Sequence, residues 1–198
     1  MRVAEKSGFT PVQYLDWERS QGSRHEYFRG EVFAMAGGTP RHNMLSARVS
    51  TALMNALDSK GCFVFSSDQK IALTGERYVY PDLSVVCGPA ELEPGTNDVL
   101  LNPMVVVEVL SSSTESYDRG LKWEGYQRLP SLTDYVLVSQ VEARIEHFER
   151  DPNGTWIYRS AGPGERLVLS CGAMLDVDRM FARAFEVVGE AAAAGRLP

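Results

Sequence analysis

A single acidic residue interrupts the most hydrophobic stretch of this chain. Glu108 stands within the run M-V-V-V-E-V-L of Met104–Leu110, whose valine content is typical of a β-strand buried on both faces. An ionised carboxylate in such a strand loses its hydration, which costs several kcal/mol unless a cation or strong hydrogen-bond donors compensate it. We therefore expect Glu108 to form a buried ion pair with an arginine or, as the favoured hypothesis, to bind a metal ion.

A second carboxylate lies in another β-rich run, Y-V-Y-P-D-L-S-V-V of Tyr78–Val86. Pro81 has no amide hydrogen to give to a sheet, so we expect a bend or a sheet edge just before Asp82. Asp82 and Glu108 are 26 residues apart, enough for two adjacent strands and a connecting loop. Two carboxylates, with water and substrate oxygens, suit Mg²⁺ or Mn²⁺ rather than zinc. Taken alone, Asp82 is more simply an aspartate at a turn or a strand end.

Three further residues could assist such a site, although each also has a simpler structural interpretation. Lys122 could orient an attacking water, but with Asp118 four residues earlier it would otherwise form a surface pair of about 0.3–0.5 kcal/mol. His42 falls near a predicted helix N-terminus, where such a residue usually packs or caps and where the helix dipole disfavours its charged form. Glu31 follows a glycine at a predicted hairpin turn, where a glutamate is by default solvated.

The elements that must position these residues are predicted from hydrophobic periodicity and turn signals, and they describe an α/β domain with a mixed central sheet. Helices are predicted after the capping residues Thr10 and Thr39, and over Tyr117–Leu129 and Asp178–Val187. A hairpin is predicted over Arg24–Met35, and strands over Cys62–Ser66, Gln69–Thr74, Tyr78–Val86, Met104–Leu110, Asp134–Ser139, Ala143–Arg150, Thr155–Ser160 and Arg166–Ser170.

The overall composition is that of an ordinary globular protein. With 198 residues the chain fits one domain, residues 1–198, with an Ala/Gly-rich tail over 185–198 that we expect to be frayed. The net charge of −6 argues against a protein that coats nucleic acid broadly, but it is compatible with a local basic groove or with a metal that screens phosphate. No apolar signal core or membrane-length segment occurs, so a cytoplasmic location is expected.

The three cysteines, Cys62, Cys87 and Cys171, are odd in number and far apart in the sequence, and they lack CxxC spacing. Each has apolar neighbours. We therefore expect reduced cysteines packed in the core, without a zinc site.

Five blocks, in order along the chain, resemble the Uma2 family, whose members are described as restriction-endonuclease-like. They are R-H-E-Y-F-R-G-E-V-F-A-M, T-P-R-H-N, P-D-L-S-V-V, V-V-V-E-V-L-S-S-S-T and Y-D-R-G-L-K-W-E-G-Y. The resemblance covers roughly Phe9–Phe181. It implies the PD-(D/E)xK nuclease fold, a mixed core sheet flanked by helices, with metal-binding carboxylates on two adjacent strands.

The resemblance also implies roles for single residues. Pro81-Asp82 matches the PD element, and Glu108 matches the second acidic position. The superfamily lysine two residues further on is replaced by Leu110, and Lys122 fits the position to which Uma2-like sequences move this lysine. A flexible lysine side chain can reach the same point from a helix.

Two further positions follow the family pattern. Glu31 corresponds to the family's acidic residue after glycine, and His42 corresponds to its histidine at the next helix start.

The leading hypothesis is a Mg²⁺-dependent endonuclease that hydrolyses phosphodiester bonds, most simply in DNA. Asp82 and Glu108 would hold the metal together with the carbonyl of Val109, and Lys122 would orient or activate the water. Glu31 would hold a second metal directly or through water, and His42 would support substrate binding or proton transfer.

Two rival hypotheses stay open: a catalytically silent nucleic-acid-binding protein of the same fold, and a metal-dependent phosphohydrolase acting on a small substrate. A homodimer is also expected, by family analogy and because Ala143–Arg150 and Trp156–Ser160 could pair or pack across an interface.

Overall fold

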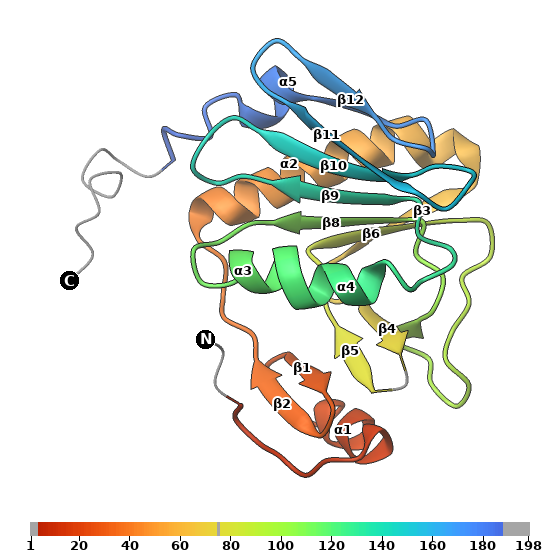
Figure 1. Ribbon diagram of the computed structural model, residues 1–198. Coiled ribbons are helices and arrows are strands. Elements are labelled where there is room, and N and C mark those ends of the chain that lie inside the picture. The colour runs from red at the N-terminus through yellow and green to blue at the C-terminus, as the bar shows by residue number, and fades with distance from the viewer. Residues whose placement is uncertain (1–3, 75, 188–198) are drawn as a thin grey trace.

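A six-stranded mixed sheet forms the centre of the computed structural model, which describes residues 4–74 and 76–187 (Figure 1). β8 (Val105–Val109) pairs in parallel with β9 (Asp134–Val138) and antiparallel with β6 (Leu83–Cys87). The sheet order is β11-β10-β9-β8-β6-β3. Its other strands, all antiparallel to their neighbours, are β3 (Cys62–Ser66), β10 (Ile145–Arg150) and β11 (Trp156–Ala161). The predicted mixed central sheet is confirmed.

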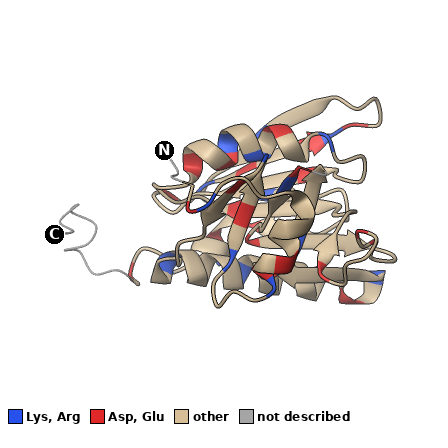
Figure 2. Ribbon diagram, turned by 90° about the horizontal axis from the view of Figure 1, so that it is seen from below, with Lys and Arg blue, Asp and Glu red and all other residues tan. Residues whose placement is uncertain are grey.

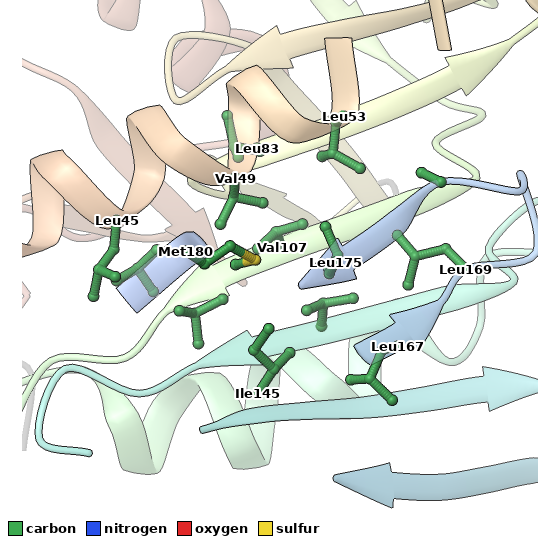
Figure 3. Close-up of a cluster of buried hydrophobic side chains, with 14 of the residues drawn as sticks. Leu45, Val49, Leu53, Leu83, Val107, Ile145, Leu167, Leu169, Leu175 and Met180 are labelled. Carbon is green, nitrogen blue, oxygen red and sulfur yellow. The ribbon is translucent and has the colours of Figure 1, made fainter. Parts of the chain in front are cut away.

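Helix α2 (Pro40–Leu57) covers one face of this sheet, as Figures 1 and 3 show. It begins with Pro40 after Thr39, whose hydroxyl accepts the N–H of His42, and a 3₁₀ turn over Asp58–Lys60 follows its end. The hairpin β12 (Arg166–Val168) and β13 (Met174–Asp176) and the short helix α5 (Val177–Phe181) complete the layer. Buried residues joining α2 to the sheet are Leu45, Val49, Leu53, Leu57, Val105, Val107 and Val109.

The opposite face is covered by a helical segment that differs from the predicted one. Instead of a continuous helix over 117–129, the chain forms α3 (Glu115–Tyr117), a π-helical turn (Asp118–Lys122) and α4 (Trp123–Tyr126). Single π turns are rare and occur often at functional sites. Here the turn carries Asp118 and Lys122, both of which are buried.

A second sheet lies below the first in Figure 1, with the strand order β2-β1-β5-β4-β7. Its hairpin, predicted from the sequence, consists of β1 (His25–Phe28) and β2 (Glu31–Ala34). The remaining strands are β4 (Lys70–Thr74), β5 (Arg77–Val79) and β7 (Val99–Leu100). Helix α1 (Pro11–Glu18) begins with a capping box at Thr10 and packs its buried Tyr14 against the tyrosines of this sheet.

The predicted strand over 78–86 is two strands in two different sheets. β5 ends at Val79, and β6 starts at Leu83 in the six-stranded sheet. Pro81 lies in the break, consistent with its missing amide hydrogen. The expected bend before Asp82 is thus a crossing between the sheets.

The prediction of three reduced cysteines is wrong for two of them. Cys62 and Cys87 form a disulfide, because β3 and β6 pair with these two residues directly opposite each other. Sequence distance hid this pairing, since 25 residues separate the cysteines. Cys171 is a free thiol.

The end of the chain also differs from its prediction. The last helix ends at Phe181 rather than Val187, and of the expected frayed tail only residues 185–187 fall within the described range. In the part of the chain that the structure describes, no helix combines the length and the hydropathy needed to cross a membrane.

Candidate functional site

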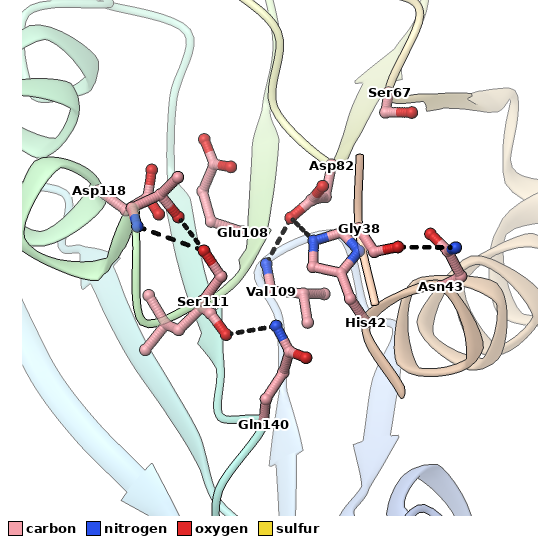
Figure 4. Close-up of polar contacts among 12 residues, drawn as sticks. Gly38, His42, Asn43, Ser67, Asp82, Glu108, Val109, Ser111, Asp118 and Gln140 are labelled. Carbon is pink, nitrogen blue, oxygen red and sulfur yellow. Dashed lines mark hydrogen bonds and ion pairs between the residues drawn. The ribbon is translucent and has the colours of Figure 1, made fainter. Parts of the chain in front are cut away.

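Asp82 lies where the chain passes from one sheet to the other. Its carboxylate Oδ2 accepts a hydrogen bond of 2.6 Å from the backbone N–H of Val109 on β8 (Figure 4). Because Val109 directly follows Glu108, this bond holds Asp82 beside the second predicted carboxylate. The Asp82 side chain is 17 % exposed, so solvent has access to this part of the cluster.

Glu108 faces the helical segment. Side chains alternate along β8, so Val107 and Val109 face α2 while Glu108 faces the opposite side. Its Oε1 accepts hydrogen bonds of 3.0 Å from the ammonium of Lys122 and 3.0 Å from the hydroxyl of Tyr126. The alternative of an arginine partner for Glu108 is thus wrong, because lysine is the cation. The surface interpretation of Lys122 is also wrong, since only 5 % of this residue is exposed.

Lys122 is shared among several carboxylates. Its Nζ lies 3.1 Å from Glu26 Oε1 and 3.5 Å from Asp118 Oδ1, in addition to Glu108. Both additional acids are buried, at 2 % and 3 % exposure. Three carboxylates thus lie within 3.5 Å of one ammonium group, and the charge of Asp82 acts on Glu108 and Asp118.

The pKa values of both Glu108 and Lys122 are raised in this buried cluster, where carboxylates are in surplus. Burial raises the pKa of Glu108 well above its ordinary value; Lys122 opposes the change, while the charges of Asp118 and Asp82 add to it. Burial by itself would lower the pKa of Lys122, but Glu108, Glu26 and Asp118 raise it well above its ordinary value. The lysine therefore stays charged, and the cluster favours uptake of a proton or another cation.

His42 joins the cluster from the first turn of α2. Its Nε2 lies 3.2 Å from Asp82 Oδ2, and the imidazole donates this hydrogen bond because an ionised carboxylate can only accept. Burial acts to lower the pKa of His42, but the bond and the charge of Asp82 raise it above its ordinary value. The expectation from the helix dipole, which disfavours the charged form, is therefore overturned by Asp82. Gly38 permits the packing, since a Cβ there would lie 2.6 Å from Nδ1 of His42.

The structure thus brings Asp82, Glu108, Lys122, His42 and the backbone of Val109 together, but it does not place Glu31 among them. Glu31 is exposed at the start of the edge strand β2.

Two acids of the cluster were missed in the sequence. Glu26, on β1, occupies the place expected for Glu31. The sequence signal that could have found it was a glutamate inside the H-E-Y-F strand, in which three successive residues including Glu26 are buried. Asp118 was identified only as a surface partner of Lys122, because a π turn cannot be recognised from helical spacing.

The donor set is compatible with a hard divalent cation. Within residues 4–74 and 76–187, no three His, Cys, Asp or Glu side chains are arranged to hold one metal ion. Mg²⁺, however, is usually bound by only one or two carboxylates and keeps several waters. Asp82 and Glu108, with surplus negative charge around them, provide two such carboxylates.

Comparison with known proteins places the chain in a family. Residues 11–177 match the Uma2 family, described as "Putative restriction endonuclease". The uncharacterized protein slr1290 of Synechocystis is 39% identical over 174 residues, which cover 87% of this chain and 90% of that protein. The uncharacterized protein sll1609 of the same organism is 28% identical over 158 residues, which cover 79% of this chain and 89% of that protein.

A solved structure shows the same fold. A protein from Anabaena variabilis, described as a putative nuclease belonging to DUF820, superimposes with a TM-score of 0.73 at 13% identity, covering 89% of this chain and 99% of that one. The fold is therefore that of the restriction-endonuclease-like proteins, a mixed sheet flanked by helices. Within that class, the chain belongs to the Uma2 family.

Proposed function

We propose that this protein is a metal-dependent endonuclease that hydrolyses phosphodiester bonds in DNA, with Mg²⁺ or Mn²⁺ as its cofactor. The observation that carries the proposal is the ammonium of Lys122, held 3.0 Å from Glu108 in a cluster where carboxylates outnumber cations. Such a cluster suits binding of a divalent cation beside a lysine that can act on phosphate chemistry. Membership of the Uma2 family supports the assignment to nucleases.

In this proposal Asp82, Glu108 and the carbonyl of Val109 hold the metal. When bound, the ion lowers the pKa of a water molecule and neutralises charge on the phosphate. Lys122 would orient the attacking water and offset the negative charge that develops as the water oxygen bonds to phosphorus and the phosphorus–oxygen ester bond breaks, with the water giving up a proton and the leaving oxygen taking one up. His42 restrains the Asp82 carboxylate through its Nε2 hydrogen bond.

The test is cleavage of plasmid and of single-stranded DNA in Mg²⁺, in Mn²⁺ and in EDTA. We expect cleavage with either metal, none in EDTA, and a loss of about 10²–10³-fold in Asp82→Asn, the scale for removing one positioned electrostatic group. Glu31→Gln serves as the matched control, because Glu31 is an exposed carboxylate outside the cluster. A wild-type rate in Asp82→Asn would contradict the proposed metal site.

Two outcomes would favour the rival functions. Metal-independent DNA binding without cleavage would indicate a silent nucleic-acid-binding protein. Hydrolysis of p-nitrophenyl phosphate without DNA cleavage would indicate a phosphohydrolase acting on small substrates.

The proposal includes a homodimer, in which two sites related by a two-fold axis act on the two strands of a duplex. β11 is an edge strand of the central sheet, and its Ile157 and Tyr158 are 38 % and 48 % exposed. An exposed edge of this kind can pair with a second strand. Light scattering at micromolar concentration tests the prediction, and a monomer there would contradict it.

A further inference from the structure

A hollow on the protein has the opposite charge to the candidate active site. Its volume is about 240 Å³, and its walls include Arg29, Arg77 and Arg128 together with one acid, Glu76. Elsewhere, Lys and Arg are scattered among Asp and Glu over the ribbon (Figure 2). In a chain with a net charge of −6, three guanidinium groups around one hollow form an unusual local surplus of positive charge.

Arg77 is the fixed member of this arginine pocket. It is 8 % exposed, and its guanidinium carbon lies 4.0 Å from the ring centroid of Phe28. One Nη donates a hydrogen bond to the carbonyl of Leu121, which uses one of its five N–H groups. Among the residues that the structure describes, no carboxylate pairs with Arg77. A buried charge without a counter-charge is costly, and a bound anion would remove that cost.

The other two arginines lie at the rim and are only loosely committed. Arg29 lies 3.7 Å from Glu76, with both side chains 69% exposed. Arg128 pairs with Glu124 at 2.6 Å, with side chains 59% and 56% exposed. Exposed pairs of this kind contribute little, so an anion can take over either arginine at small cost.

A glycine keeps the pocket open beside Arg77. A Cβ on Gly125 would lie 3.0 Å from Nη1 of Arg77 and 2.6 Å from Cδ1 of Leu73. Any larger residue at 125 would therefore force Leu73 to move and would press against the buried guanidinium. Glycine at position 125 of helix α4 thus leaves room for Arg77 to line the hollow.

We propose that the arginine pocket of Arg29, Arg77 and Arg128 binds a phosphate group. Guanidinium groups match phosphate oxygens with paired N–H donors, and one rigid and two adjustable arginines suit a tetrahedral anion. The phosphate belongs to a nucleic-acid backbone or to a free phosphate compound. The proposal is independent of the proposed nuclease activity, because it uses none of the carboxylates of the candidate active site.

The test is phosphate binding in EDTA, where no divalent metal can draw phosphate to the acidic cluster. Calorimetric titration with sodium phosphate at constant ionic strength is compared with anisotropy of a labelled 12-nucleotide oligothymidylate. The variant is Arg29→Gln/Arg128→Gln, which leaves buried Arg77 in place and so preserves the fold. Affinity should fall at least about tenfold, the change that corresponds to losing one charge-assisted hydrogen bond of about 1.4 kcal/mol.

The matched control is Arg159→Gln/Arg166→Gln, which removes the same charge from two exposed arginines on β11 and β12. A selective loss of oligonucleotide affinity in the pocket variant identifies a backbone phosphate as the ligand, and a selective loss of phosphate affinity identifies a free phosphate compound. Equal affinities in the pocket variant, the control and the wild type would overturn the proposal, as would a wild type that binds neither probe.

Discussion

Two buried carboxylates on neighbouring strands have opposite surroundings. Asp134 begins β9 and is fully buried, while Glu108 lies near the far end of the paired strand β8 and is 3 % exposed. Asp134 accepts hydrogen bonds from His147 Nε2 at 2.8 Å, from the N–H of Ser170 at 3.0 Å and from the hydroxyl of Thr133 at 2.6 Å. Glu108 accepts hydrogen bonds only from Lys122 and Tyr126 among the bonds described above. Glu26 and Asp118 contact the same lysine, and the charge of Asp82 also acts on Glu108.

Their pKa values move in opposite directions as a result. Burial acts to raise the pKa of Asp134, but the bonds from His147, Thr133 and Ser170 lower it below its ordinary value. The pKa of Glu108 is raised by the same burial and by its acidic neighbours, in spite of Lys122. A carboxylate that serves the fold is matched by donors, whereas one left among like charges is poised to take up a cation.

The largest expected effect follows removal of the ammonium group that three buried carboxylates of the acidic cluster share. Lys122→Met leaves Glu26, Glu108 and Asp118 buried together, so we expect a loss of about 3–5 kcal/mol in the free energy of unfolding at neutral pH. This corrects the sequence-based expectation of a few tenths of a kcal/mol for an exposed pair. Denaturant unfolding measures it, with Arg128→Gln, which breaks a surface pair on the same helical segment, as the control. Equal losses in the two variants would contradict a buried role for Lys122.

The next effect separates chemistry from folding. Glu108→Gln removes a proposed metal ligand, so cleavage should fall by about 10²–10³-fold. Stability should be unchanged or higher, because a costly buried charge disappears while the amide oxygen can still accept from Lys122 and Tyr126. Plasmid cleavage and melting temperature are measured on one preparation. A melting temperature far below that of the wild type would contradict this prediction and would mean that Glu108 serves the fold, as Asp134 does.

Asp134→Asn should show the reverse pattern, with a smaller magnitude. An amide cannot replace the charge facing His147, so we expect a loss of about 2–3 kcal/mol in stability. Cleavage per folded molecule should stay at the wild-type level, because Asp134 lies at the other end of the strand pair from Glu108. Denaturant unfolding and cleavage kinetics check both halves. A large loss of activity with intact stability in Asp134→Asn would contradict the prediction that Asp134 serves the fold while Glu108 serves the reaction.

How far the sequence predicted this arrangement depends on whether the signal was local. The valine-rich strand identified Glu108, and Pro81 identified the break at Asp82, because both effects act within a few residues. Glu26 was missed because only the pairing of β1 with β5 brings it beside the other sheet. The disulfide between Cys62 and Cys87 was missed for the same reason, since strand register over a long loop has no local signal.

Lys122 is the intermediate case. The family pattern predicted that it belongs to the candidate site, and the structure places it 3.0 Å from Glu108, whereas helical spacing predicted a position on the surface. The π turn over Asp118–Lys122 changes the course of the helix, and the ammonium is buried among the carboxylates. A prediction based on ideal helix geometry fails at this point because one irregular turn changes which side chains face the sheet.

The smallest effect, and the most discriminating, is the pH dependence of stability. A carboxyl whose pKa is raised on folding binds its proton more tightly in the folded state, so Glu108 should reduce stability as pH rises above its unfolded pKa of about 4.3. Asp134, whose pKa is lowered, contributes stability that is present above its unfolded pKa of about 3.9 and is lost as pH falls through its folded pKa. Melting temperatures between about pH 2 and pH 8, a range that includes the unfolded pKa values of both groups, should therefore show Glu108→Gln gaining on wild type as pH rises. Asp134→Asn should instead come closer to wild type as pH falls. Parallel curves for the wild type and both variants would mean that neither carboxyl titrates differently in the folded and unfolded states. The contrast between a matched and an unmatched buried acid would then be lost.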